Sequence, residues 1–205
     1  VLAGVVSLRA TPGARDFLEV TIRGLTAVAS ALMIVDGAKG VEERTIKLME
    51  VCRLRDTPIF TFVNKLDRDI RDAIDVLDEI ETVLKIKCAP INWPLGMGKE
   101  FKGVYNLYKD TIHVYRHGQG SQLHEVEVIE GIDSDEAKAL LGSYRDDFRD
   151  EIELVRGASN DFDLDAYLRG EMTTVVFGWA PANLGGKAMH DAILAYSPAA
   201  PTPAP

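Results

Sequence analysis

The segment Asn64-Lys65-Leu66-Asp67 combines an amide, a cation and a carboxylate within four residues, which suits it to bind a polar ligand. It follows an apolar run, residues 59–63, and precedes an amphipathic stretch, so it is expected at the carboxyl end of a strand, where doubly wound sheets bind ligands. A carboxylate at Asp67 can accept two parallel hydrogen bonds from N1 and N2 of guanine, a pair of donors that adenine lacks. Asn64 can bond the base edge or brace a neighbouring loop, and the stem of Lys65 can lie along the base. The segment therefore predicts a guanine site.

A structural interpretation of the same segment stays open. In it, the residues form a polar strand-to-helix loop, and Asp67 or Asp69 is the N-cap of the helix that follows. The two interpretations differ in whether the carboxylate of Asp67 bonds a ligand or the backbone of its own chain.

No phosphate-binding loop of the form G-x-x-x-x-G-K-[ST] occurs in the 205 residues. Two segments imitate its end, Gly98-Lys99 and Gly186-Lys187, but Trp93 and Pro181 stand where the motif requires its first glycine. A metal site is not expected either. His113 and His117 are four residues apart in a region of strand and turn, where that spacing lacks helical geometry, and no cysteine is near.

The elements that must position the segment alternate between short apolar runs and amphipathic stretches, as in βα units of a mostly parallel sheet. Strands are expected at Leu2–Leu8, Ala31–Val35 and Ile59–Val63, and helices at Asp16–Val28, Glu42–Arg55 and Asp72–Ile86. This order predicts an α/β fold with a doubly wound sheet and helices on both sides.

After Cys88 the pattern changes to a small α+β region rich in proline and glycine. Strands are expected at Val104–Tyr108, Thr111–Arg116, Leu123–Ile129 and Thr173–Phe177, and helices at Asp135–Gly157, Asp163–Leu168 and Lys187–Tyr196. We therefore expect a core at residues 1–87, an inserted subdomain at 88–172, a return to the core at 173–197 and a Pro/Ala-rich tail at 198–205.

Composition excludes several classes of protein. Lys and Arg total 23 against 32 Asp and Glu, a net charge of -9, which argues against nonspecific binding to DNA or to an anionic membrane surface. Two cysteines cannot form a disulfide scaffold, and the longest mostly apolar run, Ala27–Val35, is far short of the roughly 20 residues of a membrane span. A cytoplasmic protein is expected.

Several segments together resemble a known family. They are Thr11-Pro12-Gly13, Asp16-Phe17, Leu25–Val28, Val35–Glu42, Arg53–Pro58, Asn64–Asp69, Ala89–Pro94, Phe101–Tyr105, Glu153–Asn160 and Val176–Gly178. The chain resembles the translational GTPases, and among them bacterial peptide-chain release factor three, from about Leu8 to Pro198. The resemblance implies a P-loop GTPase-like domain that binds GTP or GDP with Mg²⁺ and acts with the ribosome and release factors in translation termination.

The resemblance assigns roles to six residues. Asn64, Lys65 and Asp67 match the guanine-recognition motif, Gly13 matches the glycine whose amide senses the terminal phosphate, and Gly178 and Ala180 match the last nucleotide loop, in which a backbone amide meets the base oxygen. No catalytic residue and no metal ligand carries over.

Four residues depart from the family pattern. Ala10 replaces the aspartate that holds Mg²⁺ through water, Ala14 replaces the histidine that orients the attacking water, Arg15 replaces an acid, and bulky Trp179 replaces a small hydroxyl residue in the last loop. The chain alone is therefore expected to be hydrolytically inactive. Three alternatives stay open: a fragment of a longer GTPase, a degenerate nucleotide-free module that binds protein or the ribosome, and a stable domain without a ligand.

Overall fold

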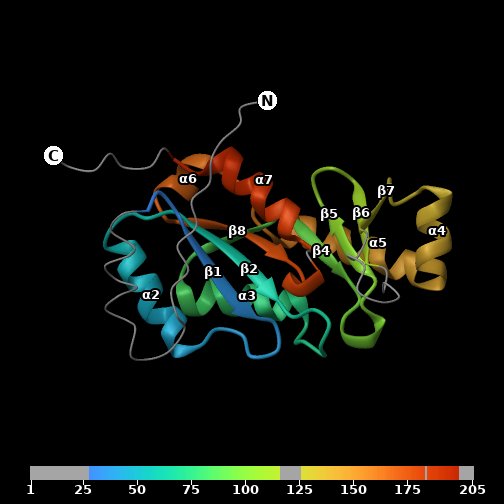
Figure 1. The fold of residues 1–205 in the computed structure, drawn as a ribbon, viewed down its shortest axis with the longest axis horizontal. Helices are drawn as coiled ribbons and strands as arrows, with labels where there is room; N and C mark the ends of the chain where they lie inside the picture. Colours follow the sequence, from blue (N-terminus) through green and yellow to red (C-terminus); the bar gives the residue numbers. More distant parts are fainter. Residues whose placement is uncertain (1–27, 116–125, 183, 199–205) are drawn as a thin grey trace.

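Four parallel strands form the main sheet of the computed structural model, which describes residues 28–115, 126–182 and 184–198 (Figure 1). In spatial order they are β1 (Ala31–Asp36), β2 (Ile59–Asn64), β8 (Met172–Phe177) and β3 (Lys87–Pro90). The inner strands β2 and β8 are continuous buried runs, because helices cover both faces of the sheet. The predicted strands at 31–35, 59–63 and 173–177 are confirmed, as is the α/β fold class.

Some of the expected elements and one candidate site residue lie in a part of the chain that the structure does not describe. The predicted strand Leu2–Leu8, the candidate Gly13 and all but the last residue of the predicted helix Asp16–Val28 lie outside the described residues.

Two pairs of helices lie on opposite faces of the main sheet (Figure 1). One face carries α2 (Glu43–Arg53) and α3 (Ala73–Leu84), and the other carries α6 (Leu164–Leu168) and α7 (Gly186–Tyr196). Helix α3 begins where the Asp72 carboxylate accepts a hydrogen bond from the Ile74 amide at 2.8 Å, which satisfies one of the free amides of its first turn. It ends at Lys85, whose φ of 50° is left-handed.

A second, antiparallel sheet stands beside the main one (Figure 1). Its strands are β4 (Asn92–Leu95), β5 (Gly103–Asn106), β6 (Thr111–Tyr115) and β7 (Val126–Glu130), in that order. Two helices follow, α4 (Asp135–Leu141) and α5 (Arg145–Ala158). The single helix predicted over 135–157 was wrong, because the chain takes a left-handed φ of 56° at Gly142 and makes a 3-10 turn, Gly142–Tyr144, between the two helices.

One hydrophobic core joins the two sheets. Its buried members include Val175 and Phe177 of β8 together with Trp93 of β4 and Phe148 of α5. The Trp93 and Phe177 rings meet edge to face, with centroids 5.2 Å apart. The second sheet is therefore packed into the same core as the main one.

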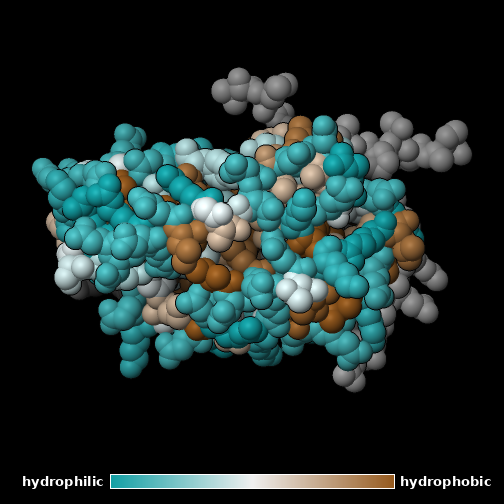
Figure 2. Space-filling model, turned by 180° about the vertical axis from the view of Figure 1, so that it is seen from behind, coloured by the Kyte–Doolittle hydropathy of each residue, from teal (hydrophilic) through white to brown (hydrophobic). Residues whose placement is uncertain are grey.

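The face seen in Figure 2 is predominantly hydrophilic, with hydrophobic side chains gathered near its middle. On α5 the side chains of Asp146, Asp147, Asp150 and Glu153 are exposed. Glu151 differs from them, because its two oxygens accept hydrogen bonds from Trp93 Nε1 at 2.7 Å and the Tyr144 hydroxyl at 2.9 Å. Among the described helices, none is long and apolar enough to cross a membrane.

Two adjacent buried threonines of β8 differ in whether their hydroxyls have a hydrogen-bond partner, so they test what such a partner contributes to stability. Both Thr173 and Thr174 are fully buried. The Thr173 hydroxyl lies 2.9 Å from Thr61 Oγ1 and 2.7 Å from the Ile59 carbonyl oxygen, whereas Thr174 Oγ1 has no hydrogen-bond partner among the described residues. We expect Thr174→Val to raise the free energy of unfolding by about 1 kcal/mol, and the matched control Thr173→Val to lower it by about 1 to 3 kcal/mol. Urea denaturation of both variants measures the difference, and equal effects would contradict it.

Candidate functional site

The predicted recognition residues lie at the carboxyl ends of adjacent strands of the main sheet. Asp36 at the end of β1 is in register with Asn64 at the end of β2, and Val63 is in register with Phe177, the last residue of β8. The loops that follow these strands therefore share one edge of the sheet. This edge brings together Asn64, Lys65, Asp67, Gly178 and Ala180.

Asn64 connects two of these loops. Its Oδ1 accepts hydrogen bonds from the backbone amides of Lys65 at 2.8 Å and Ala180 at 3.0 Å. Of the two roles open to this side chain, bracing a neighbouring loop is the one that the structure has. The loop after β8 is also held by its own strand, because the Gly178 amide donates to the Val63 carbonyl at 2.9 Å.

Lys65 takes an unusual backbone conformation, with a φ of 74°. A lysine in this left-handed region is disfavoured because its Cβ crowds the backbone. The side chain reaches back to β1, where Nζ lies 2.5 Å from Asp36 Oδ2. Burial tends to raise the pKa of Asp36, but the hydrogen bond and charge of Lys65 and the amides of Ala38 and Lys39 together lower it. This ion pair is therefore present at neutral pH.

Asp67 has a buried carboxylate oxygen that is not satisfied. Its Oδ1 is inaccessible to solvent and has no hydrogen-bond partner among the described residues. The N-cap of the following helix is Asp72, so the interpretation of Asp67 or Asp69 as N-cap was wrong. A buried acceptor without a donor is costly, and its presence in a loop at a ligand-binding edge calls for an explanation. A ligand that donates to this carboxylate would satisfy it, once the loop moves enough to expose Oδ1.

The loop after β8, Gly178–Ala180, is held by a hydrogen bond from the backbone amide of each of its three residues. The amides of Gly178, Trp179 and Ala180 donate to Val63 O, Leu184 O and Asn64 Oδ1, at 2.9, 3.1 and 3.0 Å. Trp179 is half-buried and packs against the main core. Gly178 is packed so tightly that an added Cβ would stand 2.6 Å from the Phe62 ring, so no larger residue fits without movement.

Two further residues position the site, and sequence reasoning gave neither of them this role. Asn92, at the start of β4, is buried and bonds both backbone groups of Phe177, at 2.7 Å from its amide and 2.9 Å to its carbonyl. It thus fixes the end of β8 directly before Gly178. Asp36 pairs with Lys65 as described. The only sequence signal for both was their place in segments that carry the family resemblance.

The described residues contain no cluster of side chains that by itself would hold a metal ion. Within 28–115, 126–182 and 184–198, no three His, Cys, Asp or Glu side chains gather as a metal-binding group. Ala10 and Gly13, which the resemblance places near the phosphates, lie outside these ranges. His113 is half-buried, and burial and then the charges of Lys109 and Lys187 lower its pKa. The described residues that could bind a nucleotide are therefore those predicted to contact its base, and not those predicted to contact its phosphates.

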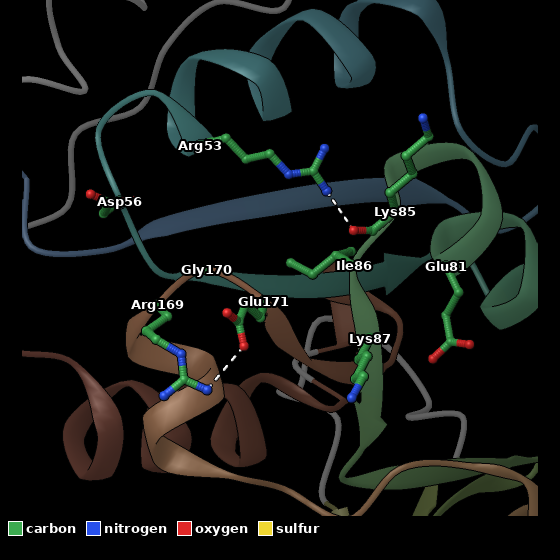
Figure 3. Close-up of a pocket in the computed structure, with 9 residues that line it drawn as sticks. All are labelled: Arg53, Asp56, Glu81, Lys85, Ile86, Lys87, Arg169, Gly170 and Glu171. Atoms are coloured by element: carbon green, nitrogen blue, oxygen red, sulfur yellow. Dashed lines mark hydrogen bonds and ion pairs between the residues drawn. The ribbon is translucent and has the colours of Figure 1, made fainter.

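A hollow of about 660 Å³ lies at the opposite end of the main sheet, and three of its lining charges, Arg53, Arg169 and Glu171, make contacts within the protein (Figure 3). Arg53 donates to the backbone carbonyls of Leu84 and Lys85, which caps the carboxyl end of α3. Arg169 pairs with Glu171 at 2.9 Å. These contacts stabilise helix and strand ends.

The fold and this edge define the class of the protein. A doubly wound parallel sheet with an N-K-x-D loop at its carboxyl end and a second antiparallel sheet is the architecture of a P-loop GTPase domain. The family model described as Elongation factor Tu GTP binding domain matches residues 6–199, nearly the whole chain. The chain belongs to this family, and it is a GTP-binding domain of the translation-factor type.

A solved structure shares the fold. The crystal structure of ttk003000868 from Thermus thermophilus is similar to this chain with a TM-score of 0.66 and 21% sequence identity. The similarity covers 92% of this chain and 29% of that one, so the chain spans less than a third of the length of that protein.

Proposed function

We propose that this chain binds a guanine nucleotide at the carboxyl edge of its main sheet, as the GTP-binding domain of a termination factor similar to release factor three. The main support for nucleotide binding is the buried Oδ1 of Asp67, which has no hydrogen-bond partner among the described residues. It lies in a loop that Asn64 connects to the loop after β8. A guanine base offers the two neighbouring donors that such a carboxylate lacks.

Each recognition residue then has a distinct role. Asp67 accepts from N1 and N2 of the base, and the stem of Lys65 lies along its face. The Ala180 amide, which donates to Asn64 Oδ1, is shared with the base oxygen. By resemblance, Gly13 contacts the terminal phosphate. When bound, GTP supplies the phosphates whose state a translation factor reports to the ribosome.

The termination role is proposed on narrower grounds. Support comes from the resemblance of Ala89–Pro94 and Glu153–Asn160 to release factor three. The partners would then be the ribosome and the release factors that it carries, with residues 88–172 as an insertion in the nucleotide-binding core. Sedimentation with ribosomes that hold a bound release factor tests this role, and equal sedimentation with empty ribosomes would argue against it.

The experiment for the nucleotide site compares two bases. The chain contains no phosphate loop, so we expect GDP to bind no tighter than about the millimolar range, roughly 4 kcal/mol, and ADP to bind at least about tenfold more weakly. Ligand-observed NMR with each nucleotide in turn measures this difference. Equal signals from GDP and ADP would refute guanine recognition.

Hydrolysis is expected to be absent from the chain itself. Positioning and charge stabilisation of the transferred phosphoryl group depend on a backbone cradle, a loop lysine and a held Mg²⁺. The 205 residues contain no such loop, and alanine occupies positions 10 and 14. Phosphate release from GTP should therefore stay at background, with or without ribosomes. Turnover comparable to an intact translational GTPase would contradict this prediction.

A second candidate function is a nucleotide-free module of the same fold. The three amides of the loop Gly178–Ala180 all have acceptors within the protein, which favours a loop complete without ligand. Such a module would bind ribosomes or a protein partner equally well with and without GDP. It would give no NMR signal with any nucleotide, which distinguishes it from the first proposal.

A further inference from the structure

We propose that Asp36 is a positioning residue of the guanine site: through an ion pair it holds Lys65 in its left-handed conformation, and with it the recognition loop. The inference rests on the proposed function and deepens it, because it names the group on which the geometry of base recognition depends. That group lies on a different strand from the recognition motif.

Asp36 is a rigid anchor. It ends β1 in register with Asn64, and its Oδ1 accepts hydrogen bonds from the amides of Ala38 at 3.0 Å and Lys39 at 3.4 Å. The side chain is only 14% exposed. Its second oxygen is thus aimed in a fixed direction, toward Lys65.

Lys65 is held at two points. Its amide donates to Asn64 Oδ1 at 2.8 Å, and its Nζ lies 2.5 Å from Asp36 Oδ2. A lysine at a φ of 74° is an uphill conformation, and such conformations persist only where surrounding contacts hold them. The ion pair is the side-chain contact that does so here. Without it the residue is freer to relax to an ordinary φ.

A change of the Lys65 backbone to an ordinary φ would displace the base-recognition groups that come before and after it in the chain. Asn64 Oδ1 holds the Lys65 amide and the Ala180 amide together, and Asp67 lies two residues further along the same loop. The sheet does not depend on this arrangement, because the Gly37 amide donates to the Asn64 carbonyl at 2.9 Å. Loss of the ion pair should therefore loosen the loops and leave the strands in place.

Amide hydrogen exchange in the Asp36→Asn variant tests the positioning role directly. Asparagine keeps an oxygen for the Ala38 and Lys39 amides but removes the charge. We expect the amides of Lys65 and Ala180 to exchange at least tenfold faster, and the Gly178 amide to stay within twofold of wild type. The control Asp135→Asn removes an exposed ion pair on α4 and should change none of them.

Nucleotide binding supplies the second measurement. GDP affinity should fall at least threefold in Asp36→Asn, and the same substitution should have no further effect in a Lys65→Met background. Unchanged exchange or unchanged GDP affinity in Asp36→Asn overturns the inference while the proposed function stands. If the wild-type chain binds no nucleotide, the proposed function fails, and Asp36 is then a residue of the fold alone.

Discussion

Replacing Trp93 by alanine should lower the free energy of unfolding by about 3 to 5 kcal/mol, the usual cost of removing a large buried aromatic side chain. Trp93 is fully buried, its ring meets Phe177 of the main sheet, and its Nε1 donates to Glu151 at 2.7 Å. The substitution therefore opens a cavity between the sheets and removes a donor from a half-buried carboxylate. Urea denaturation followed by circular dichroism measures the loss.

A graded control separates packing from the hydrogen bond. Trp93→Phe keeps most of the ring volume and loses the donor, so it should cost about 1 to 2 kcal/mol. In a Glu151→Gln background the cost of Trp93→Phe should shrink, because the charge that strengthens the bond is gone. A loss below about 1 kcal/mol in Trp93→Ala would show that the two sheets do not share a core.

The main sheet was predictable because its inner strands are buried on both faces. Residues 59–63 and 173–177 are short runs of β-branched and aromatic residues with strong strand propensity, and both are buried between the helices. The spacing of apolar residues also predicted α3, which was expected at Asp72–Ile86 and is shorter in the structure, at Ala73–Leu84.

The strands that the sequence did not reveal are those that contain proline. β3 carries Pro90 and β4 carries Pro94, and proline usually argues against a strand because it cannot donate a ladder hydrogen bond. Both strands stand at the edge of their sheet, where one side of the backbone needs no partner. A sequence pattern does not reveal which strands will be edges.

The candidate site also has a part that the sequence predicted and a part that it did not. Asn64, Lys65 and Asp67 form a local motif, so their types and spacing predicted a site. Asp36 and Asn92 act through contacts with residues 29 and 85 positions away, which only the folded chain brings together. Reliance on such distant contacts is typical of residues that position a site.

Asp67→Asn should invert the base preference of the chain, the largest functional change expected from a single substitution. An asparagine can offer only one acceptor and one pair of donors to the base edge, so the two donors of guanine at N1 and N2 lose their charged partner. Removing a charge-assisted hydrogen bond of this kind costs about 1.5 to 3 kcal/mol, or roughly 10- to 150-fold in affinity. Xanthine carries a carbonyl at C2, which the amide donors of asparagine can bond.

Ligand-observed NMR with GDP, ADP and XDP on wild type and Asp67→Asn measures this inversion. Wild type should prefer GDP, and the variant should lose that preference and gain one for XDP. The matched control is Asp69→Asn, which removes the same charge from an exposed position two residues away and should keep the GDP preference. The variant should also be no less stable than wild type, because Asp67 Oδ1 has no partner within the described protein to lose. A variant that still prefers GDP over XDP would exclude Asp67 as the base-recognition residue and would turn attention to Trp179 as the side chain that fills the base pocket.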